Sequence, residues 1–428
     1  MRMKKKLLAG FLCSVVIAMG VTPSSAIASN SEEVIRVMAN GMATDAYTAT
    51  MIEMAEEYSA ANPYGVTFEF EMYSNDEYKT KLTTLMAANN VPDMFFTWEL
   101  GYLQPFVESG KVLSIQPYLD EDEEWKNSFK EGVLDYTTYD GECYAIPTQI
   151  AYCTMFYNQD MFDEYGISVP QTYDEFCSVC ETLKENGVTP MALAGSEAWI
   201  PAQFLQQIAL GIDGGKSSDA ITDGTGVWNN DSFVKAAEEC QNMIDNGYFS
   251  DGLLAMSYDE AANKLKDGSV AMYFMATWDG DSFTADKEDL VGKISCFNMP
   301  GVEEDYSTAV VGSVDTSWAL GATCSNPEAC VGFLKFMTST DWQTRDLLNN
   351  AKVPSVMLDA DSVEGADDIA YRILENMEGT KMYPWWDRVF GSGEGEAFNN
   401  ACLASFGGDD AQQAFDECQA TVEANANL

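Results

Sequence analysis

Strand-like and helix-like segments alternate along the first hundred residues, and this alternation restricts the fold more than any other feature. Apolar strand patterns at 34–40, 66–73 and 94–98 are separated by helical patterns at 48–63 and 76–93. A β-α-β-α-β series builds a parallel sheet with helices on its faces. Ligands bind such sheets beyond the carboxyl ends of the strands. We therefore expect an α/β fold with a site after one or more of these strands.

The same alternation begins again in the second half of the chain. There, the patterns predict helices from Tyr173 and Pro201 and at 231–246, 257–267 and 326–339, and strands at 189–195, 269–278, 292–300 and within 309–322. Two α/β halves, joined by several crossings of the chain, fit this order better than one large sheet.

The N-terminus has the pattern of a secretory leader. A basic start containing Arg2 precedes an apolar run at 7–21, and the small residues of Ala26-Ile27-Ala28 predict a signal peptide at 1–28, cleaved after Ala28. The run is short of the roughly 20 residues that span a membrane. Cys13 lies too early and follows Phe11 and Leu12, so there is no clear lipobox. We expect an exported, soluble protein in the periplasm or cell envelope or outside the cell.

The charge balance excludes several classes of function. The chain has 68 acidic and 23 basic residues and no histidine, a net charge of −45. Such a surface repels nucleic acid and anionic lipid, and the absence of histidine excludes histidine-based catalysis and histidine-ligated zinc. The acidic run 120–124 predicts a solvated face, without the spacing of an EF-hand.

The loop 211–218 resembles a phosphate-binding loop in part. The motif requires a glycine at position 210, where this chain has Leu210, so we do not expect a phosphate site there. We expect no metal and no cofactor.

Ten cysteines follow the leader, and their placement favours free thiols. An even number in an exported protein is typical of disulfides. However, Cys177, Cys180, Cys240 and Cys330 lie on apolar faces of predicted helices, where cysteine behaves as a small hydrophobic residue. We favour core thiols and leave a disulfide open, with Cys143–Cys153 as the best local candidate.

Six segments carry a resemblance to a known family: VPDMFF, ESGKVLSIQPYL, YDGECYAIPTQIAYCTMFYNQDMFDEYGISVPQTYDEF, NGVTPMALAG, AANKLKDGSVAMYFMATW and NPEACVGFLKFMTS. Each motif alone is weak, but their order and spacing are strong evidence. In these segments the chain resembles the extracellular solute-binding proteins of sugar ABC transporters, which include maltose-binding protein. The likeness covers nearly all of the mature chain.

The resemblance implies a two-lobe periplasmic-binding-protein fold of type II, with a ligand cleft between the lobes. Three crossings are implied near 147–151, 311–317 and 352–355. The N-terminal lobe would then comprise 29–148 and 316–352, and the C-terminal lobe 149–315 and 353–428. Closure of the lobes around the ligand is implied as well, since hinged domain closure is the characteristic motion of periplasmic binding proteins.

The resemblance also implies which residues hold the sugar. An indole face attracts the C–H groups of a pyranose ring, and charged or amide side chains bind its hydroxyls. Either Trp385 or Trp386, adjacent in YPWWDRVF, would pack inward while the other faces the cleft, and we favour Trp386 for the cleft. The implied residues are Asp45, Trp98 and Glu99 from the N-terminal lobe, Glu197, Trp199, Trp278, Trp385 or Trp386 and Arg388 from the C-terminal lobe, and Asp315 near a crossing, with Tyr47, Tyr152 and Asp279 as weaker candidates.

For several of these residues a structural role stays open. Trp98, Trp199 and Trp278 could belong to the core, Arg388 could pair with Asp387 on the surface, and Asp315 could serve the hinge.

The functional hypothesis is a monomeric binding protein, without enzymatic activity, that captures a carbohydrate, preferably an oligosaccharide, and delivers it to a membrane permease. The alternatives are a secreted carbohydrate-active enzyme and a binding protein for a solute other than sugar.

Overall fold

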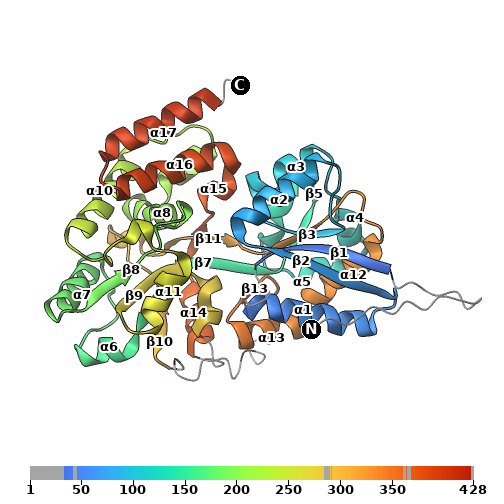
Figure 1. Cartoon of the computed structure of the whole chain (residues 1–428), viewed down its shortest axis with the longest axis horizontal. Coiled ribbons are helices and arrows are strands. Elements are labelled where there is room, and N and C mark those ends of the chain that lie inside the picture. Colours follow the sequence, from blue (N-terminus) through green and yellow to red (C-terminus); the bar gives the residue numbers. More distant parts are fainter. Residues whose placement is uncertain are drawn as a thin grey trace, which may run out of the picture.

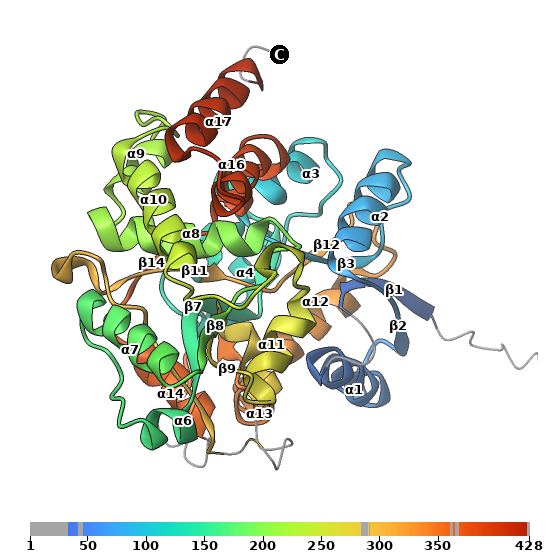
Figure 2. The same cartoon turned by 60° about the vertical axis from the view of Figure 1, so that its left-hand side comes forward.

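The protein is described by a computed structural model that covers residues 33–41, 46–283, 290, 292–359, 363 and 368–425. Its strands lie mainly in two sheets with helices packed around each, and Figures 1 and 2 show two groups of elements side by side. We call the part built on the five-stranded sheet the N-terminal lobe and the part built on the seven-stranded sheet the C-terminal lobe. The predicted leader lies outside the described residues.

The sheet of the N-terminal lobe has the strand order β2-β1-β3-β12-β6. β1 pairs in parallel with β2 and β3, which confirms the strand–helix alternation predicted for this region. β12 pairs antiparallel with β3 and β6. The strands are β1 (Glu33–Asn40), β2 (Val66–Tyr73), β3 (Met94–Thr97), β6 (Ala145–Pro147) and β12 (Ser317–Leu320).

Helices cover this sheet, and α1 packs against α12 and α13 beside it (Figure 1). The helices and short elements of this lobe are α1 (Ala46–Ala61), α2 (Asn75–Ala87), η1 (Leu100–Tyr102), α3 (Gln104–Glu108), α4 (Gln116–Glu121), α5 (Glu123–Ser128), η2 (Val133–Thr137), β4 (Thr138–Tyr139), β5 (Glu142–Cys143), α12 (Pro327–Met337) and α13 (Thr340–Asn350).

The sheet of the C-terminal lobe is organised around the long strand β7. β7 is buried along nine of its ten residues, which explains a continuous apolar sequence without alternation. It pairs with β9, β10, β11 and β13. The strands are β7 (Gln149–Asn158), β8 (Thr189–Ala192), β9 (Val270–Ala276), β10 (Ile294–Phe297), β11 (Ala309–Val314), β13 (Val353–Pro354) and β14 (Lys381–Tyr383).

The helices of this lobe begin where capping residues allow. Thr172 accepts a hydrogen bond from the backbone N–H of Glu175 at 3.2 Å and so starts α7. α8 begins at Trp199, earlier than predicted, because Pro201 is tolerated in a first turn. The elements are α6 (Gln159–Glu164), α7 (Tyr173–Glu185), α8 (Trp199–Asp213), α9 (Lys216–Thr222), α10 (Asp231–Asp245), η3 (Leu253–Ala255), α11 (Tyr258–Lys266), η4 (Thr277–Phe283), η5 (Glu304–Tyr306), α14 (Asp368–Met377), α15 (Trp386–Val389), α16 (Gly391–Phe406) and α17 (Ala411–Asn425).

The chain passes between the two sheets in each of the three regions where crossings were predicted. Only Thr148 separates β6 from β7, and only Asp315 and Thr316 separate β11 from β12. After α13, β13 pairs with β7, and Val356 then bridges Phe129 of the N-terminal lobe. The exact residues at which each lobe begins and ends stay a prediction.

The ten cysteines that the structure describes are free thiols. The suggested Cys143–Cys153 disulfide is wrong, because the two residues lie in different lobes. Cys143 donates a hydrogen bond to Ala145 O, while Cys153 donates one to Gln203 Oε1.

Within the described part of the chain, no helix is long and apolar enough to span a membrane, and no cluster of three or more Cys, Asp or Glu side chains could hold a metal ion.

Candidate functional site

A row of aromatic rings lies on the C-terminal lobe close to the crossings. Trp199 is at the start of α8, Trp278 lies in η4, and Trp385 precedes α15. The ring centroids of Trp385 and Trp278 are 5.3 Å apart, and those of Trp278 and Trp199 are 6.0 Å apart. Trp199 and Trp278 are partly exposed, whereas Trp385 is buried behind Trp278. We call these three residues the indole row.

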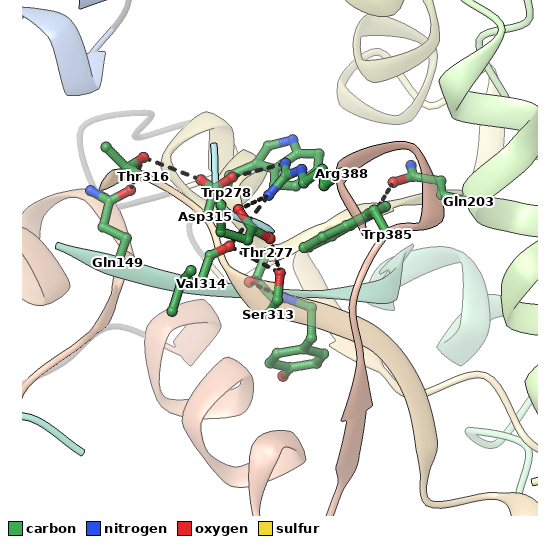
Figure 3. A network of polar contacts seen from close by, with 12 residues as sticks. Gln149, Gln203, Thr277, Trp278, Ser313, Val314, Asp315, Thr316, Trp385 and Arg388 are labelled. Atoms are coloured by element: carbon green, nitrogen blue, oxygen red, sulfur yellow. Dashed lines mark hydrogen bonds and ion pairs between the residues drawn. The ribbon is translucent and has the colours of Figure 1, made fainter. Parts of the chain in front are cut away.

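Each indole N–H of the row already has a partner within the C-terminal lobe. Trp199 donates to Glu197 Oε2 at 2.9 Å, and Trp278 donates to Tyr258 Oη at 2.9 Å. Trp385 donates to Gln203 Oε1 at 3.1 Å, as Figure 3 shows. Because the polar atoms are bound, the orientation of the rings is set before any ligand arrives, and the exposed ring surface is apolar.

Tyr258 is itself held by a buried carboxylate. Asp279 accepts hydrogen bonds from Tyr258 Oη at 2.5 Å and from Tyr273 Oη at 2.8 Å. Burial raises the pKa of Asp279 to about 6, although both of these hydrogen bonds lower it. Asp279 therefore positions Trp278 through Tyr258 from beneath the row.

Arg388 joins the indole row to the crossing between β11 and β12. Its Nη2 lies 3.2 Å from Asp315 Oδ1, and its Nη1 donates to Val314 O at 3.3 Å (Figure 3). Its Cζ lies 4.2 Å from the centroid of the Trp385 ring and 5.6 Å from that of Trp278. Guanidinium groups stack on indole faces in this way. The predicted alternative, a surface pair with Asp387, is not the arrangement observed.

Glu99 reaches this group from the N-terminal lobe. It follows β3, is 0% exposed, and its Oε2 lies 3.6 Å from Nη1 of Arg388. Its Oε1 accepts a hydrogen bond from the Ser313 hydroxyl of β11. Burial raises the pKa of Glu99 to about 7, although the Arg388 guanidinium and the Ser313 hydroxyl lower it. A carboxyl group that titrates near neutrality thus connects the two lobes.

Lys352 lies at the third crossing and forms a second charged group beside the row. Its Nζ is 3.3 Å from Asp281 Oδ2 and donates a hydrogen bond to Trp278 O. The same Nζ lies 5.5 Å from the ring centroid of Tyr47 in the N-terminal lobe. Burial lowers the pKa of Lys352, but the surrounding carboxylates, led by Asp281, outweigh this effect and raise it. Lys352 therefore stays charged between the lobes.

The structure brings most of the predicted residues together. Those that meet around the indole row are Glu99, Glu197, Trp199, Trp278, Asp315, Trp385 and Arg388. Asp45 lies outside the described residues. Of the weaker candidates, Tyr47 faces Lys352 and Asp279 supports Tyr258, whereas Tyr152 is fully buried and donates to Ile373 O.

Two tryptophans of the predicted set lie outside the indole row, and for Trp98 this is the core position that the sequence left open. Trp386 packs between Phe233 and Phe398, at centroid distances of 4.5 and 4.6 Å. Both adjacent tryptophans are buried, at 3% and 2% exposed, but it is Trp385, and not the favoured Trp386, that lies against Trp278 and Arg388. Trp98 packs edge-on against Phe96 and Tyr102, each at 4.8 Å. These neighbouring rings, rather than open space, cover most of its surface.

Four residues of the site were not among the predicted ligand residues: Tyr258, Lys352, Gln203 and Ser313. The sequence offered a signal for Lys352, because a lysine among apolar residues at a predicted crossing indicates a charged group between the lobes. The glutamines of α8 were another, because Gln203, Gln206 and Gln207 lie on an apolar helix whose one charged residue is Asp213 at its end. Nothing in the sequence distinguishes Tyr258 or Ser313 from similar residues.

Comparisons with known proteins identify a family and a shared fold. Residues 44–344 match the family described as bacterial extracellular solute-binding protein. A multiple sugar-binding protein of Streptococcus mutans is 22% identical over 299 residues, which are 68% of this chain and 68% of that protein. An uncharacterised ABC transporter extracellular-binding protein of Pyrococcus horikoshii is 25% identical over 325 residues, covering 75% of this chain and 70% of that one.

Solved structures share the fold across nearly the whole chain. One, from work on xylan utilisation by Caldanaerobius polysaccharolyticus, has a TM-score of 0.83 at 26% identity and covers 91% of this chain and 100% of that one. A chitin oligosaccharide binding protein has a TM-score of 0.82 at 22% identity and covers 91% of this chain and 99% of that one. These likenesses confirm the predicted two-lobe fold. The match over residues 44–344 shows that the chain belongs to the bacterial extracellular solute-binding protein family.

Proposed function

We propose that this protein binds an uncharged oligosaccharide on the indole row and delivers it to the membrane permease of an ABC transporter. The observation that carries this proposal is the row itself, with centroid spacings of 5.3 and 6.0 Å and every N–H bound within its own lobe. Apolar ring faces beside charged and amide groups match the two kinds of surface on a pyranose. The two partly exposed rings, Trp199 and Trp278, have centroids 6.0 Å apart and together offer more face than one sugar unit covers, which favours an oligosaccharide.

The charges of the site favour a neutral sugar over an anionic solute. Arg388 is paired with Asp315 and Glu99, and Lys352 is paired with Asp281. The chain as a whole carries a net charge of −45. An anionic ligand would have to displace a carboxylate and approach against this field, whereas sugar hydroxyls can bind the paired groups without displacing them.

The names of related proteins support the same ligand class. The Streptococcus mutans relative is a multiple sugar-binding protein, and the second structural relative binds chitin oligosaccharide.

We infer that the chain acts outside the cytoplasm, as a monomer released from its leader after Ala28, and that the lobes close around the sugar. The division into 29–148 with 316–352 and 149–315 with 353–428 belongs to this proposal.

A secreted hydrolase is the second candidate, and the pairing of the carboxylates disfavours it. A glycosidase requires one acid to donate a proton and a second to act as base or nucleophile. Here Asp315 is bound by the Arg388 guanidinium at 3.2 Å, which occupies the carboxylate that would have to act as base or nucleophile. Glu99, whose pKa burial raises to about 7, could hold a proton, but it is 0% exposed in this arrangement.

A thermal-shift screen with xylo-, chito-, malto- and galacto-oligosaccharides tests the proposal. A ligand that binds only the folded protein, at 100 times its Kd, stabilises it by about 2.7 kcal/mol. We expect one neutral series to raise the melting temperature, with the sugar recovered intact by chromatography. Cleavage of that sugar would favour the hydrolase, and stabilisation by a peptide or organic anion alone would overturn the sugar assignment.

A further inference from the structure

Two cysteine sulfurs lie close together in the N-terminal lobe, away from the indole row. Cys324 is in the connection between β12 and α12, and Cys330 is in the first turns of α12. Their Sγ atoms are 3.5 Å apart and share a hydrogen bond. Among the cysteines that the structure describes, no other pair has a hydrogen bond between its sulfurs.

The backbone holds both residues in fixed positions. The Cys324 N–H donates to Gly321 O at 2.9 Å, and the Ser325 N–H donates to Asp93 Oδ1 at 3.0 Å. Asn326 caps α12 by accepting from the Ala329 N–H at 3.2 Å, which fixes the turn that carries Cys330. The sulfurs therefore meet because the connection is anchored at three successive points.

The two sulfurs differ in accessibility and acidity. Cys324 is partly exposed, whereas Cys330 is fully buried. The hydrogen bond from the Cys330 thiol lowers the pKa of Cys324. A thiolate that solvent can reach is the form that attacks disulfides, so Cys324 is suited to react first and Cys330 to react second.

We propose that Cys324 and Cys330 are an oxidisable pair that forms an intramolecular disulfide with low-molecular-weight disulfides outside the cell. The Cys324 thiolate attacks one sulfur of the small disulfide and releases one thiolate. Cys330, on losing its proton to solvent, then attacks the Cys324 sulfur of the mixed disulfide and releases the second. The protein loses two thiol hydrogens, and one small disulfide is reduced to two thiols.

The required movement is small, and the compartment favours the reaction. A disulfide has a sulfur–sulfur distance of about 2.05 Å, so the Sγ atoms must approach by roughly 1.5 Å. The family is extracellular, where disulfides persist. The bond would tie the β12–α12 connection to its helix without touching the indole row, so sugar affinity should not change.

The test uses the full-length mature protein at pH 8 with oxidised glutathione. Remaining thiols are alkylated in denaturant, and intact mass and peptide mapping count and locate them. We expect two of the ten thiols to become protected, with one peptide linking 324 to 330, and dithiothreitol to restore both. Oxidation should also raise the melting temperature.

Matched variants decide the outcome. Cys324→Ser and Cys330→Ser should each abolish the cross-link, while Cys177→Ser, on a helix that carries a second cysteine one turn away, should leave it intact. Full alkylation of all ten thiols, a stable glutathione adduct on Cys324, or a cross-link between other cysteines would overturn the proposal. None of these readouts depends on sugar binding, so they stand apart from the test of the proposed function.

Discussion

The two lobes bring different kinds of chemistry to the site. In the C-terminal lobe, the indole row is assembled by partners of the same lobe: Glu197, Tyr258 and Gln203. In the N-terminal lobe, Glu99 has two partners, Ser313 and Arg388, and both belong to the C-terminal lobe. The row can therefore exist whatever the position of the lobes, whereas the Glu99 contacts exist only in this arrangement.

A second contact between the lobes is made by the backbone, where η1 of the N-terminal lobe packs on α15 and α16. A Cβ added to Gly101 would overlap Val389 O and lie 2.9 Å from Gly391 N. No side chain fits between these two backbones. The difference between the lobes indicates that affinity should reside mainly in the C-terminal lobe, while the N-terminal lobe controls closure.

The largest effect separates a core tryptophan of the C-terminal lobe from a partly exposed tryptophan of the indole row. Trp386→Ala removes a ring packed between Phe233 and Phe398, and a core tryptophan changed to alanine costs roughly 3–5 kcal/mol of unfolding free energy. Trp199→Ala, at a partly exposed ring, should cost far less. Urea denaturation of both variants measures the difference. Equal losses would show that Trp199 is as much a core residue as Trp386.

The second effect concerns affinity. Trp199→Ala shortens the indole row at its exposed end, and truncating a binding hot spot costs roughly 2 kcal/mol or more, which is about thirtyfold in Kd. Calorimetric titration with the sugar found by the screen measures it. Val227→Ala, a change at an exposed apolar residue outside the row, serves as the control. Unchanged binding by Trp199→Ala would remove this end of the row from the site.

The third effect tests the packing between the lobes. Gly101→Ala places a methyl group against the backbone of α15, and overpacking costs typically 1–3 kcal/mol. We propose that the sugar is held in this arrangement of the lobes. Because the cost falls on this arrangement and not on one in which η1 and α15 are apart, we expect sugar affinity to fall about tenfold. Gly393→Ala is the matched control, since its Cβ would meet only Asn425 Nδ2 at 3.5 Å. Small-angle scattering with saturating sugar should show a more open Gly101→Ala protein, and an equally compact one would contradict this role.

The last effect is the pH dependence of the Glu99 contact. The pKa of Glu99 is raised to about 7 by burial, so its contribution to stability is fully present below the ordinary pKa near 4.5 and is lost as pH rises through 7. The Arg388 guanidinium is already one of the groups that set this pKa, so a rise from 4.5 to about 7 corresponds to a loss of roughly 3 kcal/mol. Glu99→Gln should melt at a temperature that changes less between pH 5 and pH 8. An identical pH profile in both proteins would show that Glu99 does not titrate in this range.

The sequence predicted the architecture well because hydrophobic periodicity and capping are local signals. Helices such as the one after Thr172 and the parallel β1–β2–β3 order follow from patterns within short windows. Trp199 and Trp278 were predicted as candidates because one stood in a loop and the other at the end of a strand, whereas Trp385 was predicted only as one of an adjacent pair.

The rest depended on tertiary contacts that no local pattern encodes. Trp385 and Trp386 have the same neighbours in sequence, and only the packing of Phe233 and Phe398 decides which one turns inward. Tyr258 matters because Asp279, 21 positions away, aligns its hydroxyl with Trp278. Lys352 was placed at a crossing, but its partners Asp281 and Tyr47 come from distant segments.

One measurement tests the division of roles between the lobes most directly: calorimetric titration of the sugar into Trp278→Ala and Trp98→Ala, with circular dichroism to confirm that both are folded. Trp278 is the middle ring of the indole row, whereas Trp98 is packed among rings of the N-terminal lobe. The account predicts at least about a thirtyfold loss of affinity for Trp278→Ala and a Kd within about twofold of the parent for Trp98→Ala. A folded Trp278→Ala that binds normally, together with a Trp98→Ala that does not, would contradict it.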